Sequence, residues 1–313
     1  MSTPPTRSAR RRRNVRRRRV LAGVVSVIIV AALTVGIFGF VRSLGERAQA
    51  TPDTTPAANA STPTPEAAAP PSFDTAAAAD QAMAVLADYS DAARATEDAL
   101  YQATQKLRSA TTAADADAAQ AETQQAVDAV KADAEAYRAQ ITADAAGTNT
   151  QPAGGDVAAQ MAYLHQYVFS YNSAEWGDYN PYGGDCTNFT SQGLIARGWH
   201  IDGTWYSKGA MWTASKPWIA TAPMAAYFDK LGFGYSTEAD LDRVRVGDVG
   251  LFSWGETQAG MDHTMTVSKV EYVPGGPPVV SFISHNSDGE YRELTHALYV
   301  EHTDSTVRIY HIP

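Results

Sequence analysis

The single cysteine of the chain, Cys186, lies where a thiol can act as a nucleophile. It follows the turn-forming residues Gly183, Gly184 and Asp185, and residues 187–195 have the composition of a helix. Asp185 is therefore predicted as the N-cap and Cys186 as the first helical residue. Free backbone N–H groups and the helix dipole at that end lower the pKa of a thiol and can stabilise an oxyanion. The pattern favours a catalytic cysteine over a buried structural one.

A cysteine nucleophile needs a base, and two of the seven histidines lie at the ends of predicted strands. One strand with period-two alternation begins at His263, and the strand after it ends at His285. In an antiparallel pair the start of one strand lies beside the end of the other, so we expect these two rings to be neighbours. The predicted set is Cys186 as nucleophile, His263 as general base and acid, and His285 as the residue that orients His263.

Other residues near this set allow further interpretations. His263, His285 and Asp262 could bind zinc, but the thiolate is better explained as a nucleophile, so we predict no metal and no cofactor. Candidates for contacts to the substrate or the oxyanion are Tyr182, Asp185 and Trp205. Tyr182 is chosen for its closeness to the cysteine in sequence, and Trp205 because aromatic faces often line substrate clefts.

Residues 156–313 are predicted to form the globular domain that positions these side chains. An amphipathic helix with Asp156 as its N-cap opens the domain, and all six Trp of the chain lie between Trp176 and Trp254. Strands are predicted at residues 249–254, 263–270 and 279–285, and residues 296–300 and 307–311 also have a strand-like pattern. The domain is long enough to bury its own core.

Three blocks of this domain resemble a bacterial putative amidase domain family, over about residues 156–300. They are Asp-Cys-Thr-Asn-Phe-Thr-Ser-Gln at 185–192, Gly-Asp-Val at 247–249 and Asp-His at 262–263. The family belongs to the papain-like cysteine hydrolases, with the NlpC and CHAP cell-wall hydrolases. The resemblance implies an α+β fold with N-terminal helices packed on an antiparallel sheet, and amide hydrolysis, commonly in peptidoglycan. It also makes Asn286 the alternative to His285 as third member of the triad.

The N-terminal residues predict a membrane anchor. Residues 1–19 contain nine Arg and no acid, whereas the 22 residues of 20–41 carry no charge. A helix of that length spans about 33 Å, which matches a hydrocarbon core of about 30 Å. We predict a cytoplasmic Arg-rich tail (1–19) and a transmembrane helix (20–41). Because positive charge stays cytoplasmic, the rest of this single-pass cell-membrane protein is predicted to be extracytoplasmic.

The anchor could also be removed, because residues 48–50 read Ala-Gln-Ala, which resembles a signal-peptide cleavage site. Cleavage after Ala50 would release a secreted protein. A retained anchor is favoured, since the apolar run is longer than a typical signal sequence and charged residues separate it from the site.

Two segments separate the anchor from the domain. Residues 42–72 are rich in Pro, Thr and Ala and predict a disordered linker, because they lack the apolar side chains of a core. Residues 73–147 are rich in Ala and acidic residues and predict two long helices, as a hairpin or a coiled coil. We expect the break at residues 109–112, with Thr112 as the N-cap of the second helix.

Charge narrows the possible functions. The chain beyond the Arg tail carries a net charge of −18, which argues against nucleic acid as a partner of the main body. We predict a membrane-anchored cysteine amidase or peptidase that hydrolyses an amide bond of cell-wall peptide or peptidoglycan through an acyl-enzyme. Two alternatives remain: an acyl-transferring transamidase on the same fold, and a non-catalytic anchored scaffold that binds the cell wall. The sequence does not predict the oligomeric state.

Overall fold

A computed structural model describes residues 68–256 and 260–313. The predicted cytoplasmic tail, transmembrane helix and nearly all of the linker lie outside these residues. Among the helices that are described, none has the length and apolar character needed to cross a bilayer.

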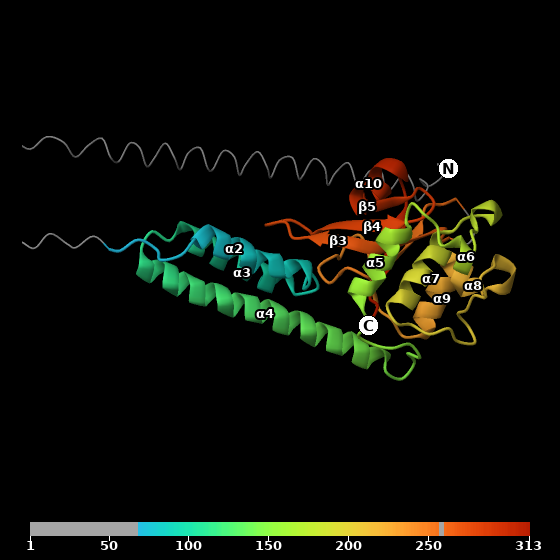
Figure 1. Cartoon of the computed structure of the whole chain (residues 1–313), viewed down its shortest axis with the longest axis horizontal. Helices are drawn as coiled ribbons and strands as arrows, with labels where there is room; N and C mark the ends of the chain where they lie inside the picture. The colour runs from blue at the N-terminus through green and yellow to red at the C-terminus, as the bar shows by residue number, and fades with distance from the viewer. Residues whose placement is uncertain (1–67, 257–259) are drawn as a thin grey trace, which may run out of the picture. The chain divides into compact units, whose positions relative to one another are not determined.

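The Ala-rich segment folds into three packed helices where two were predicted. They are α2 (Thr75–Met83), which continues into η1 (Ala84–Ala87), α3 (Arg94–Ser109) and α4 (Ala113–Ala145). Thr112 caps α4 as predicted, because its hydroxyl accepts a hydrogen bond from the Asp115 N–H at 3.2 Å. Helices α3 and α4 run antiparallel with Leu100, Val127 and Val130 buried between them, and α2 lies alongside (Figure 1).

Polar contacts join this helical segment to the C-terminal domain. Asp91, in the loop before α3, is fully buried and accepts hydrogen bonds from Arg138 at 2.8 and 2.6 Å. Arg243 of the domain reaches back to the Asp91 carbonyl at 2.8 Å and to Asp133 at 2.7 Å. The Tyr272 hydroxyl donates to Asp98 at 2.6 Å.

The C-terminal domain contains short helices and one antiparallel sheet, which confirms the predicted α+β class. Its helices are α5 (Val157–Tyr167), α6 (Ser173–Trp176), η2 (Asn180–Tyr182), α7 (Cys186–Ala196), η3 (Met211–Thr213), α8 (Lys216–Ile219), α9 (Thr221–Lys230), α10 (Leu294–His296) and η4 (Ala297–Glu301). Its strands are β1 (Tyr235–Ser236), β2 (Val249–Ser253), β3 (His263–Glu271), β4 (Val279–Ser284), β5 (Gly289–Glu293) and β6 (Thr306–Tyr310). The strand order is β1-β6-β2-β3-β4-β5.

One predicted strand is wrong. Residues 296–300 lie in α10 and in η4, which is a π-helical turn. Leu294, Ala297 and Leu298 are the buried residues there, and their spacing of three and four is helical rather than alternating.

The sheet has two faces with different contents. We call the side of the sheet that contacts α5, α7 and α9 the helix face. Leu251, Thr264 and Ile283 lie on it. On the far face, which α10 and η4 cover, lie Phe252, Met265, Val267 and Phe282, with Leu294 and Leu298 against them. Because successive side chains of a strand point to opposite faces, each β3 residue belongs to one face or the other.

Removing the carboxylate of Asp91 tests the buried Asp91–Arg138 pair within the helical segment. Asp91→Ala leaves the Arg138 guanidinium without its buried partner and should lower the free energy of unfolding by about 2 kcal/mol. Chemical denaturation of the chain measures the change. Glu122→Ala, which breaks the exposed Lys106–Glu122 pair, is the control and should cost less than about 0.5 kcal/mol. Equal effects of the two substitutions would contradict the prediction.

Candidate active site around Cys186

Cys186 is the first residue of α7, as the sequence predicts. Its thiol is buried, 3.8 Å from the Thr187 hydroxyl and within reach of the backbone N–H groups of Thr264 and Thr187. Burial raises the pKa of the Cys186 thiol, and the hydrogen bonds from Thr264 and Thr187 only partly oppose this. In this arrangement the sulfur is a neutral thiol at neutral pH, although its surroundings contain donors suited to a thiolate.

A cluster of three threonine hydroxyls backs the cysteine. Thr264 of β3 lies 2.9 Å from both Thr187 of α7 and Thr221 of α9, and the last two are 3.4 Å apart. The cluster ties the starts of two helices to the start of β3. No sequence pattern predicts this cluster, because its three residues are far apart in the chain.

Asp185 occupies the N-cap position of α7, but its side chain does not cap the helix. Its carboxylate instead accepts hydrogen bonds from the Tyr179 N–H at 2.9 Å, from Asn188 Nδ2 at 2.9 Å and from His285 Nδ1 at 2.6 Å. The carboxylate is buried and acts as a hub that connects the turn before α7, the first turn of α7 and the end of β4. It is therefore a structural anchor of the loop that carries the cysteine.

His285 follows β4 and is fully buried on the helix face. Its ring is stacked between Tyr171 and Phe189, with centroid distances of 3.6 and 3.7 Å. Besides the Asp185 carboxylate, the backbone carbonyl of Tyr167 lies 3.1 Å from its Nε2. The Tyr167 carbonyl oxygen accepts from Nε2, and the Asp185 carboxyl group engages Nδ1. No nitrogen of His285 is left to orient His263.

Asn286, the alternative third member of the triad, lies at the N-terminus of α7. Its Oδ1 accepts hydrogen bonds from the backbone N–H of Asp185 at 2.5 Å and of Cys186 at 2.9 Å. Its Nδ2 donates to Asn180 Oδ1 at 2.5 Å. The helix cap that was predicted for Asp185 is thus supplied by Asn286, from a residue 100 positions later in the chain.

His263 begins β3 as predicted, but its ring lies on the far face of the sheet. It stacks on Trp254 at a centroid distance of 4.2 Å, and its Nε2 is buried with no hydrogen-bond partner among the described residues. Burial lowers the pKa of His263 to about 3, and the nearby positive charges of Arg292 and His302 contribute. The ring is therefore neutral.

The expected closeness of His263 and His285 does not occur, because the two side chains lie on opposite faces of the sheet. Thr266 pairs with Ile283 in the register of β3 and β4, so these two side chains share a face. His263 is three residues before Thr266 and His285 is two residues after Ile283, so the alternation along the strands places the two rings on opposite faces. The structure thus brings Asp185, Cys186, His285 and Asn286 together and places His263 elsewhere.

The two aromatic candidates have opposite environments. Trp205 is fully buried in the core with its Nε1 donating to Ser191 at 3.1 Å, so it lines no cleft. Tyr182 is 57% exposed and lies at 6.3 Å from the ring of Trp212, which is 75% exposed. These two rings form an exposed aromatic pair beside the turn that leads to Cys186.

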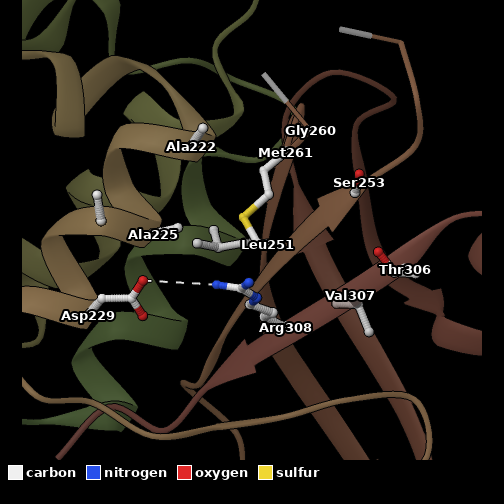
Figure 2. Close-up of a pocket in the computed structure, with 11 residues that line it drawn as sticks. Ala222, Ala225, Asp229, Leu251, Ser253, Gly260, Met261, Thr306, Val307 and Arg308 are labelled. Carbon is white, nitrogen blue, oxygen red and sulfur yellow. Dashed lines mark ion pairs between the residues drawn. The ribbon is translucent and has the colours of Figure 1, made fainter. Parts of the chain in front are cut away.

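A cavity of about 430 Å³ lies on the helix face between α9 and strands β2 and β6 (Figure 2). Small side chains of α9, Ala222 and Ala225 among them, form one wall. At one end Arg308 faces Asp229 at 3.9 Å. Its floor includes Leu251, which pairs with Thr264 in the sheet, so the cavity is one strand away from the threonine cluster.

The rate of thiol alkylation tests the state of Cys186. Because burial raises its pKa, the thiolate forms only above the usual range for a thiol, so reaction with iodoacetamide should be slow at neutral pH and increase with pH. The rate against pH, measured by mass spectrometry, should lie to the alkaline side of glutathione under the same conditions. Cys186 is the sole cysteine, so Cys186→Ala gives the background. A fast, pH-independent reaction at neutral pH would contradict this.

Substitution of His285 tests its structural role. His285→Ala leaves the Asp185 carboxylate buried and unpaired and opens a gap between two aromatic rings, which should cost about 3 kcal/mol of unfolding free energy. His296→Ala is the matched control, since that side chain is largely exposed, and should change it by less than about 0.5 kcal/mol. A stable His285→Ala protein would show that the buried pair contributes little.

Comparison with known proteins gives one match. Residues 155–310 match the family model described as "Putative amidase domain". No curated protein and no solved structure matches the chain. The match supports an amidase-like hydrolase at the level of the family. The C-terminal half of the chain is thus a member of the putative amidase domain family, as the resemblance of its sequence predicts.

Proposed function

We propose that the protein is a cysteine amidase or peptidase in which Cys186 is the nucleophile. The observation that carries the proposal is the position of Cys186 as first residue of α7 within the matched domain, with backbone N–H groups of two threonines directed at its sulfur. A sulfur at a helix N-terminus among such donors is suited to become a thiolate once substrate is bound. The proposal assumes a papain-like arrangement of helices on the sheet.

The proposed reaction is acyl transfer through a thioester. Cys186 Sγ attacks the carbonyl carbon of the amide, and the thiol proton passes to the imidazole of His263 and then to the leaving amine. Water hydrolyses the thioester, which releases the carboxylic acid and regenerates the thiol. In the described arrangement His263 faces away from Cys186, so this route requires the start of β3 to rearrange when substrate binds.

The proposed substrate is an amide bond of cell-wall peptide or peptidoglycan, reached from a membrane anchor. The evidence for this anchor is the uncharged run of residues 20–41 beside the Arg tail. The acidic body gives no attraction to anionic wall polymers, so recognition must come from specific contacts. The exposed pair Tyr182 and Trp212, next to the turn before Cys186, is suited to such contacts.

A second candidate function is a non-catalytic module that binds the wall peptide. The position of His263 favours it, because a ring that stacks on Trp254 on the far face of the sheet is out of reach of the Cys186 thiol proton. The raised pKa of the buried thiol favours it as well. The two functions differ in whether covalent bonds of the substrate are cleaved.

Incubation with purified peptidoglycan separates these functions. The wild-type chain should release soluble fragments with a new carboxylate, identified by mass, and Cys186→Ala should release none while its thermal unfolding midpoint stays unchanged. His263→Ala should lower the rate by about 10²- to 10⁴-fold if His263 is the base. An added amine acceptor that appears in the product would indicate transamidation. Binding without any cleavage by the wild type would favour the binding module.

A further inference from the structure

The cavity between α9 and strands β2 and β6 exists because α9 presents small side chains to the sheet. Ala222, Ala225 and Ala226 lie on the face of α9 that lines the cavity, and Asp229 follows them on the same face. Larger side chains would fill this space, whereas the methyl groups leave about 430 Å³ open. This volume is in the range of pockets that hold small molecules. The wall from Ala222 to Asp229 is about 10 Å long.

The floor of the cavity consists of two cross-strand pairs on the helix face of the sheet. Leu251 pairs with Arg308, and Ser253 pairs with Thr306. Because alternate residues of a strand share a face, all four side chains point to the side that α9 covers. Arg308 thus lies at a charged end of the cavity, and Leu251 and Met261 form its apolar middle (Figure 2). The hydroxyls of Ser253 and Thr306 lie at the other end.

Contacts with two tyrosines position the charged groups at the Arg308 end. The hydroxyl of the fully buried Tyr310 donates to Asp229 Oδ1 at 2.8 Å, which fixes the carboxylate. The Arg308 guanidinium lies over the Tyr235 ring at 4.9 Å from its centroid and donates to the Tyr310 hydroxyl at 3.5 Å. Its Nη1 is 3.9 Å from Asp229 Oδ2, which is too long for a hydrogen bond. The two opposite charges therefore face each other without direct contact.

Much of the hydrogen-bonding capacity at this end is unused within the part of the chain that the structure describes. The Arg308 guanidinium has five N–H donors and makes one long hydrogen bond there, and Asp229 Oδ2 accepts none. A carboxylate fits the planar donors of Arg308, and an ammonium group fits Asp229 Oδ2. In an α-amino acid both groups are attached to one carbon, so one molecule can contact both side chains.

We propose that this cavity binds a free α-amino acid with a large apolar side chain. The carboxylate of the ligand accepts from the Arg308 guanidinium, and its ammonium group donates to Asp229. Its side chain lies along Leu251 and Met261, where it loses contact with water. Cys186 does not line the cavity, and the ligand is bound without being cleaved, so the inference is independent of the proposed function.

A series of ligands tests the two charges separately on the unmodified full chain. L-phenylalanine should bind with a Kd of about 1 mM, measured by saturation-transfer difference NMR. 3-Phenylpropionate lacks the ammonium group and phenethylamine lacks the carboxylate, so each should bind at least about tenfold more weakly. Equal binding of the three ligands, or no saturable binding of L-phenylalanine, would overturn the proposal.

N-acetyl-L-phenylalanine distinguishes a free amino acid from the carboxyl end of a peptide. It keeps the carboxylate and an N–H but has no charge on the nitrogen, so it should also bind at least about tenfold more weakly than L-phenylalanine. Binding as tight as that of L-phenylalanine would show that the cavity takes peptide ends and would overturn the assignment to free amino acids.

Substitutions locate the binding in the cavity. Arg308→Gln and Asp229→Asn should each weaken the binding of L-phenylalanine at least about tenfold. Ala226→Leu keeps both charges but fills part of the space, and it should weaken binding by a similar factor. Lys230→Gln is the matched control, because this exposed charge is next to Asp229 in the sequence and does not line the cavity, so binding should stay unchanged. Binding by all four variants at the wild-type level would contradict the proposal.

Ligand preferences of the variants assign each charge to its partner. In Arg308→Gln the preference for L-phenylalanine over phenethylamine should disappear, because the carboxylate has lost its partner. In Asp229→Asn the preference over 3-phenylpropionate should disappear for the corresponding reason. Preferences that persist in both variants would overturn the proposal. The ligand series on the unmodified chain decides it even where a variant, checked by its thermal unfolding midpoint, does not fold.

Discussion

The buried pair between Asp185 and His285 fixes the position of α7 on the sheet. The His285 ring is stacked between two aromatic rings, and the Asp185 carboxylate also holds the turn before the helix. Each partner is followed directly by a residue of the candidate site, Cys186 after Asp185 and Asn286 after His285. One buried hydrogen bond therefore sets the distance between Cys186 and the side chain that caps its N–H. A buried polar pair has this effect because moving either partner leaves the other without a hydrogen bond.

Successive side chains of β3 lie on opposite faces of the sheet, and this separates His263 from Cys186 in the described arrangement. Thr264 directs its backbone N–H at the cysteine, while His263, one residue earlier, stacks on Trp254 beneath Arg292 and His302. Catalysis through His263 thus needs a change in the strand itself rather than a side-chain rotation. Such a change disrupts the pairing of β3, so binding of the substrate would have to supply the free energy for it.

Local signals in the sequence predicted where helices and strands begin, but not which side chains of different elements face one another. Cys186 at a helix start, Thr112 and Asp156 at N-caps and His263 at a strand start follow from neighbouring residues alone. The register of β3 against β4 does not, because a shift of one residue moves every side chain to the other face. The hydrogen-bond partners of His285 lie 100 and 118 positions earlier in the chain, and no sequence pattern predicts them. The same holds for the capping of α7 by Asn286.

The antiparallel path of the helical segment determines where the domain is held. The Ala113 N–H donates to the Ala69 carbonyl at the tip formed by the turn between α3 and α4, so the first described residues lie at that tip. The domain contacts the segment farther along α4, where Arg243 donates to the Asp133 carboxylate. The 20 helical residues between these two points of α4 span about 30 Å. The segment is thus a stiff arm that sets a fixed distance between the first described residues and the domain.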